Sequence, residues 1–155
     1  MKTIPYLTLC LVLLVSCKDP KKDTLAELTA LLKGIETEME TYQATLTSIN
    51  TTHSAMLNKH MEGVRSGETN QAIAEMITPH KRVVVNYEEA LKTYLNLIPK
   101  LEEIISRGKE EATSAAQLQS SLEQVIGEKD SILFQLEALK EEHEKYREQF
   151  EQIES

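Results

Sequence analysis

Residues 73–105 read IAEMITPHKRVVVNYEEALKTYLNLIPKLEEII, and this stretch decides the fold because its apolar residues recur at alternating spacings of three and four. Such a heptad repeat is typical of α-helices that pack side by side. A second apolar row beside the first widens the face beyond a two-stranded seam, which predicts a helix that covers two partners. The two rows are Ile73, Met76, His80, Val83, Tyr87, Ala90, Tyr94, Leu97, Leu101 and Ile104, and Ile77, Val84, Leu91, Ile98 and Ile105.

The same rhythm continues on either side of this stretch, from Leu25 to His60 and from Ala115 to Ile153. Glycine-containing breaks at residues 63–69 and 106–109 divide the chain, so we predict helices over about 24–63, 69–107 and 110–154. Each would be about 60 Å long at 1.5 Å per residue. Short connections force neighbouring helices to reverse direction.

Residues 24–155 are therefore predicted to form an all-α fold, a long antiparallel three-helix bundle of coiled-coil type. In its geometry this resembles spectrin-repeat-type bundles. A competing prediction is a self-associating, periplasm-spanning fibre of parallel helices, similar to the murein-lipoprotein class. The two evenly spaced breaks argue against a continuous helix of that kind.

Smaller features refine the helices. Pro79 and Pro99 interrupt the middle segment without shifting its register, so we expect a kink at one or both within a single continuous helix. Ser114 and Gln117 have the spacing of a capping box at a helix start. Lys129 occupies a seam position, where its stem should be buried while its amine reaches a neighbouring glutamate.

The first seventeen residues carry a different signal. Lys2 precedes an uncharged run from Thr3 to Val15, which is too short to cross a membrane as a helix. The run ends in Leu14-Val15-Ser16-Cys17. This segment resembles the signal peptide and lipobox of bacterial lipoproteins, which implies removal of residues 1–16 and acylation of Cys17. At least two acyl chains are needed for stable attachment to a membrane.

The lipoprotein resemblance sets expectations for location and partners. Residues 17–23 would be the lipid anchor and a charged tether, and Lys18 in place of an aspartate favours the outer membrane of the cell envelope. Losing residues 1–16 removes Lys2 and leaves sixteen Lys and Arg against twenty-five Asp and Glu, a net charge of −9. We therefore expect contact with the membrane through acylated Cys17, a monomer, and no binding of nucleic acid.

The candidate chemistry lies in the histidines, because all four occupy seam positions. A hairpin turning near residue 66 places His53 opposite His80, and a second turn near residues 108–110 places His143 beside His60. Imidazole and thioether groups suit copper, and imidazole also suits zinc. Two interpretations remain: a copper, zinc or haem site, or polar layers that fix how the helices pair. The candidate ligands are His53, His60, His80, His143, Met56 and Met76.

The sequence contains no phosphate-binding loop, nucleophile elbow or His-Glu-x-x-His helix, so we predict no catalytic residues and no enzyme. The preferred function is a lipid-anchored helical scaffold or interaction module without a cofactor. The alternatives are the metal- or haem-binding bundle and the self-associating fibre.

Overall fold

The computed structural model describes residues 19–154, and within them the chain is entirely helices and short turns. The helices are α1 (Pro20–Ser66), α2 (Gln71–Leu95), α3 (Leu97–Gly108) and α4 (Ala115–Glu154). The predicted all-α class is therefore confirmed. The predicted signal peptide and Cys17 lie outside the described residues.

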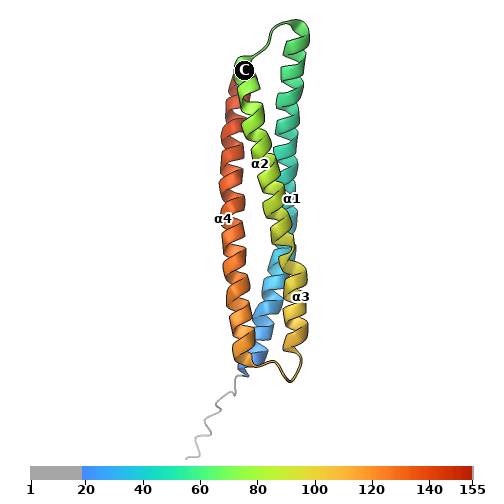
Figure 1. Ribbon diagram of the computed structural model, residues 1–155, viewed down its shortest axis with the longest axis vertical. Helices are drawn as coiled ribbons and strands as arrows, with labels where there is room; N and C mark the ends of the chain where they lie inside the picture. The colour runs from blue at the N-terminus through green and yellow to red at the C-terminus, as the bar shows by residue number, and fades with distance from the viewer. Residues whose placement is uncertain (1–18, 155) are drawn as a thin grey trace, which may run out of the picture.

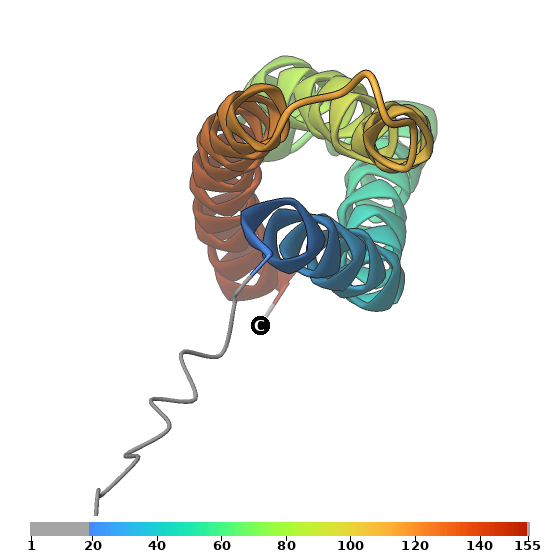
Figure 2. The same cartoon turned by 90° about the horizontal axis from the view of Figure 1, so that it is seen from below.

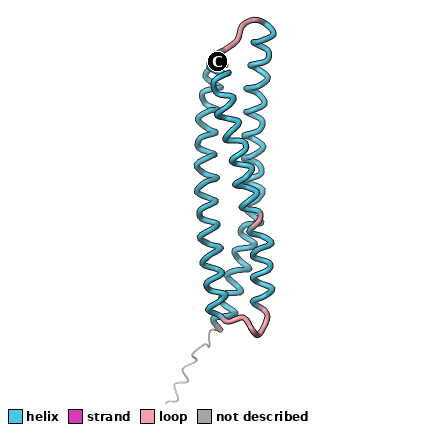
Figure 3. Tube along the Cα trace, viewed as in Figure 1, coloured by secondary structure: helices cyan, strands magenta, loops and turns pink. Residues whose placement is uncertain are grey.

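The helices form three rods that lie side by side (Figure 1). α1 is one rod, α2 and α3 together return along it, and α4 runs in the direction of α1; the turns between them are at the two ends (Figure 3). Seen from below, the rods surround a common axis (Figure 2). α1 contacts the other three helices, and α4 also contacts α2 and α3. We call the end with the start of α1 and the α3–α4 turn the proximal end, and the end with the α1–α2 turn the distal end.

α1 begins earlier than predicted. The Asp19 side chain accepts hydrogen bonds from the Lys21 and Lys22 backbone N–H groups at 3.1 and 3.4 Å, and Pro20 occupies the first helical position. An aspartate cap followed by proline is a strong helix start, since proline needs no hydrogen-bond partner there. The prediction that the tether extends to residue 23 is therefore wrong, because the helix includes residues 20–23.

The distal turn, residues 67–70, overlaps the predicted break at residues 63–69. α1 ends at Ser66, and Gly67 adopts a left-handed conformation with φ of 78°, which glycine accommodates without a Cβ clash. The Asn70 side chain then caps α2 by accepting from Ala72 N–H at 3.0 Å and Ile73 N–H at 3.3 Å. Both helix ends are thus satisfied locally.

The two prolines of the middle rod behave differently. Pro79 lies inside α2, which continues through it, whereas α2 ends at Leu95 and α3 begins at Leu97, just before Pro99. Pro99 has no N–H to donate to the Leu95 carbonyl, and its ring crowds that carbonyl. The prediction of one continuous middle helix is therefore wrong at Asn96.

α4 begins at Ala115 and not near residue 110. Ser114 and Gln117 form the predicted capping box: Ser114 N–H donates to Gln117 Oε1 at 2.9 Å, and Gln117 N–H donates to Ser114 Oγ at 3.2 Å. The proximal turn therefore includes residues 109–114, and the Thr113 hydroxyl holds it by donating to the Arg107 carbonyl at 2.7 Å.

The buried side chains follow the predicted seams and form two separate hydrophobic clusters. The proximal core contains eighteen buried residues contributed by all four helices, and it extends from Leu28 and Leu118 to Ile49, Val83 and Leu139. The distal core contains only Met56, Ile73, Met76 and Phe150. The middle rod presents the wide face that was predicted, since Val84 and Leu91 of its second row are also buried.

Candidate functional site

Three histidines meet between the two cores, one from each rod. His80 of α2 lies in the centre, with its Nδ1 3.3 Å from His53 Nδ1 of α1 and its Nε2 3.0 Å from His143 Nδ1 of α4. The side chains of His80 and His143 are almost completely buried, whereas His53 is half-buried. We call His53, His80 and His143 the histidine layer.

The rings of the histidine layer also contact one another. His53 stacks on His80 with ring centroids 5.5 Å apart, and His143 is tilted against His80 at 5.3 Å. The rings of Tyr146 and His80 form a T-shaped pair with centroids 5.6 Å apart. His80 is thus enclosed by rings from α1 and α4, which fixes the relative positions of all three rods at this level.

Neutral rings can satisfy both hydrogen bonds of the histidine layer. A neutral imidazole has one N–H donor and one bare nitrogen acceptor, so His80 can donate to one neighbour while it accepts from the other. When all three rings are neutral, the N–H groups in these two hydrogen bonds point in one direction along the series from His53 through His80 to His143. His143 Nε2, at the end of the chain, is buried without a hydrogen-bond partner.

The surroundings favour the neutral rings. Burial, followed by the adjacent His143 and His53, lowers the pKa of His80 from 6.5 to about 4. Burial followed by the nearby Lys81 charge lowers the pKa of His53. Burial also lowers the pKa of His143, where Glu144 opposes the shift and Arg147 adds to it. These shifts indicate a layer that is uncharged at neutral pH.

The structure brings together only part of the predicted ligand set. His53 and His80 are paired as predicted, but His143 pairs with His80 and not with His60. His60 Nδ1 is buried without a partner, and no hydrogen bond joins it to the histidine layer. Met56 and Met76 pack in the distal core with Ile73 and Phe150.

The histidine layer is not arranged around a common point. A tetrahedral zinc ion needs its nitrogen ligands about 2.0–2.1 Å from one centre. His80 instead presents its two nitrogens to different neighbours, which lie on opposite sides of its ring. In residues 19–154 there is no group of three or more His, Cys, Asp or Glu side chains that could hold a metal ion.

A second polar cluster, which is partly buried, joins the three rods nearer the proximal end, and its acidic member was missed in the sequence. The Tyr94 hydroxyl donates to Glu38 Oε2, while Lys129 Nζ lies 3.3 Å from the same oxygen. Lys129 thus finds the glutamate that its seam position predicted. Burial raises the pKa of Tyr94, and its hydrogen bond to Glu38 raises it further. Nothing in the local sequence separates Glu38 from the many exposed glutamates.

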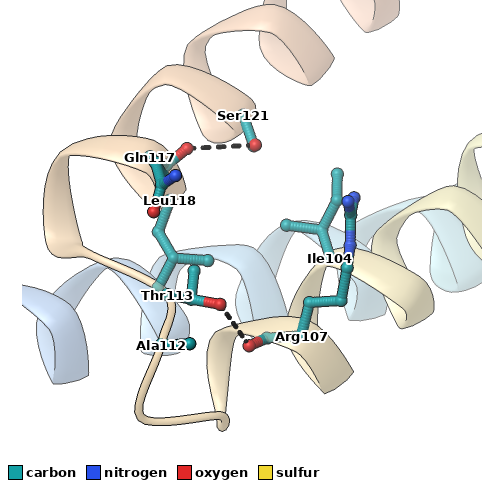
Figure 4. A pocket seen from close by; sticks show the side chains of 7 residues that line it. All are labelled: Ile104, Arg107, Ala112, Thr113, Gln117, Leu118 and Ser121. Carbon is teal, nitrogen blue, oxygen red and sulfur yellow. Dashed lines mark hydrogen bonds between the residues drawn. The ribbon is translucent and has the colours of Figure 1, made fainter.

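A small pocket lies at the proximal turn (Figure 4). Ser121 donates to the Gln117 carbonyl and Thr113 to the Arg107 carbonyl, so these hydroxyls already have partners within the chain. The pocket is therefore a result of how the proximal turn folds between α3 and α4. Its lining residues are Ile104, Arg107, Ala112, Thr113, Gln117, Leu118 and Ser121.

Comparison with known protein families, curated proteins and solved structures finds no match to this chain. No helix within residues 19–154 combines the length and the apolar character that a membrane span requires.

Proposed function

We propose that this protein is a lipid-anchored lipoprotein of a bacterial cell envelope, held in the outer membrane, that acts as a non-enzymatic helical scaffold or interaction module. The observation that carries the proposal is the sequence Leu14-Val15-Ser16-Cys17, preceded by a short uncharged run and followed by Lys18. Only Lys18 lies between Cys17 and the Asp19 cap of α1. Acylation of Cys17 would therefore attach the proximal end of the bundle almost directly to the membrane surface.

The arrangement of the rods supports a role as a spacer. At the proximal end, Lys21 Nζ donates to the Glu110 carbonyl at 2.5 Å, which ties α1 to the α3–α4 turn. At the distal end, Lys59 lies 3.5 Å from Glu154 and joins α1 to α4. The 47 residues of α1 extend about 70 Å at 1.5 Å per residue. An anchored bundle that stands upright would present its distal end at about that distance from the lipid.

For the packing we propose an antiparallel three-helix coiled coil with spectrin-repeat-like geometry. Its support is the seam itself: buried residues recur at heptad spacing along every rod, and all three rods contribute one histidine at the same level. A polar layer of this kind fixes register and helix pairing in coiled coils. We therefore assign the histidine layer a structural role in preference to copper, zinc or haem binding.

The anchor is tested with two cysteine variants of the full chain expressed in a bacterium that processes lipoproteins. Cys17→Ser should abolish incorporation of labelled palmitate and move the protein out of the detergent phase after phase separation. Cys10→Ser is the matched control, because Cys10 lies in the segment that processing removes. Unchanged detergent partitioning of Cys17→Ser would contradict the lipoprotein assignment.

A further inference from the structure

The histidine layer separates two hydrophobic cores of very different size. On its proximal side, Ile49, Val83 and Leu139 belong to the core of eighteen buried residues. On its distal side, Met56, Met76 and Phe150 belong to the core of four. Among the fully buried residues, the change from one core to the other occurs at the histidine of each rod, and the half-buried Tyr146 packs against both cores. The polar layer is therefore a boundary between two packing units as well as a contact between rods.

The distal unit, which comprises residues 54–79 and 144–154, is weakly held compared with the rest of the bundle. Besides its four buried residues, it contains three large apolar side chains on α1 that are exposed: Leu57, Met61 and Val64. A groove of about 540 Å³ lies between α2 and α4 beside Met76 and Ile153. Segments with few buried apolar contacts open at lower free energy than the global transition. We therefore expect the distal unit to open at a lower free energy than the proximal core.

Protons act directly on the boundary. In the closed layer the nitrogens of adjacent rings are 3.3 and 3.0 Å apart, so two neighbouring rings cannot both carry a positive charge without strong repulsion. Once the layer opens, each ring is solvated and binds protons as an ordinary histidine. The open form consequently gains protons relative to the closed form as the pH falls.

The charged groups around the layer do not offset this effect. Lys81 on α2 disfavours protonation of His53. On α4, Glu144 favours a charged His143, but Arg147 disfavours it and pairs with that glutamate. Glu40 and Lys140, from α1 and α4, line a groove beside His143 and have opposite charges. Tyr146 contacts His80 through its ring.

We propose that the histidine layer is an acid-sensitive joint: when it takes up protons, the distal unit opens while the proximal bundle stays folded. The distal unit comprises residues 54–79 and 144–154. Its opening uncovers Met56, Met76 and Phe150 at the end of the rod farthest from residue 20. The proposal rests on the packing of the described residues and does not depend on acylation of Cys17.

Hydrogen exchange of the full chain in mild detergent tests the joint. Protection factors are measured at pH 7.5 and pH 5.0 and compared between residues 54–79 and residues 84–108. From the shift at His80 alone, with its pKa lowered to about 4 from 6.5, distal protection should fall about thirtyfold. Distal protection should stay below proximal protection at both pH values, because proximal amides exchange only when the whole bundle unfolds. Equal protection of the two segments, or distal protection that does not change with pH, would overturn the proposal.

Two variants assign the effect to the histidine layer. His80→Leu replaces the central ring with an apolar side chain that can join the two cores, so the acid-induced loss of distal protection should largely disappear. His60→Gln removes a histidine that lies outside the layer, and it should respond to acid as the unmodified chain does. A response of unchanged size in His80→Leu, or one that is lost in His60→Gln, would contradict the assignment. The pH response of the unmodified chain tests the joint even without His80→Leu.

Discussion

His80 Nε2 and His143 Nδ1 lie 3.0 Å apart, and their side chains are 0% and 1% exposed. Two imidazoles so close, away from solvent, can share one N–H between them but cannot both be charged. The pair therefore stabilises the bundle only while at least one ring is neutral. Because the two rings bind protons more readily in the unfolded chain, the free energy of unfolding depends on pH.

The first prediction is loss of stability in acid. The pKa of His80 is about 4 in the folded protein and about 6.5 in the unfolded chain, so the unfolded state binds more protons between these values. The contribution is complete above pH 6.5 and is lost as the pH falls toward 4. Urea titrations should show a free energy of unfolding about 2 kcal/mol lower at pH 5 than at pH 7.5. A value that rises or stays level on acidification would contradict this assignment.

The histidine layer shows how far the sequence could predict the site. The pairing of His53 with His80 followed from heptad spacing and a single turn, and the structure confirms it. The partner of His143 was wrong because the proximal turn is longer than assumed, with α3 ending at Gly108 and α4 beginning at Ala115. The longer turn shifts α4 by about one helical turn against α2. As a result His143 lies beside His80 and not beside His60.

Other differences arise from effects that periodicity does not contain. The apolar seam continues unchanged through Asn96, although the helix is interrupted there because Pro99 lacks an N–H. Glu38 is likewise one glutamate among many until Tyr94 and Lys129 approach it from other rods. Heptads therefore predicted the helical class and its seams, while loop length and contacts between rods decided the local details.

The second prediction concerns the Glu38 cluster. Glu38→Ala leaves the buried Tyr94 hydroxyl without its acceptor and Lys129, 16% exposed, without its counter-charge. The variant should lose about 1–3 kcal/mol of stability in urea titrations. Lys129→Met keeps the stem volume and should cost less than about 1.5 kcal/mol. Glu137→Ala, which breaks an exposed pair with Lys140, is the control and should change stability by less than about 1 kcal/mol. Similar losses in Glu38→Ala and Glu137→Ala would argue against a special role for the cluster.

The third prediction contrasts two helical glycines. A Cβ at Gly108 would lie 2.6 Å from Leu25 Cδ2 and 2.8 Å from Leu118 Cδ2, so alanine there must displace the half-buried Leu25 and the buried Leu118 side chains. A Cβ at Gly127 would meet nothing within 4 Å. Gly127→Ala should therefore raise stability by about 1 kcal/mol through helix propensity, whereas Gly108→Ala should lower it by about 1 kcal/mol or more. Thermal melts of the two variants compare them directly, and a more stable Gly108→Ala would contradict the close packing.

The fourth prediction addresses metal binding. Because His80 offers its two nitrogens to opposite neighbours, zinc or copper should leave the melting temperature at neutral pH unchanged. A ligand held by the folded state would add RT ln(1 + [L]/Kd) to its stability. His53→Ala is the diagnostic variant. Metal-induced stabilisation of the unmodified chain that disappears in His53→Ala would support the metal-binding alternative in place of the structural layer.

The last prediction distinguishes the single bundle from the self-associating fibre. The buried face of α1 is covered by α2, α3 and α4 of the same chain, so residues 19–155 should sediment as an elongated monomer of about 15 kDa. The exposed side chains with seam-like spacing on α1 are Leu57, Met61 and Val64, which is where a second copy would pack. Three partly exposed side chains provide far less area than the roughly 1,200 Å² of a stable interface. A stable trimer that Met61→Lys disrupts would favour the fibre, whereas a monomer at every concentration measured would support the single bundle.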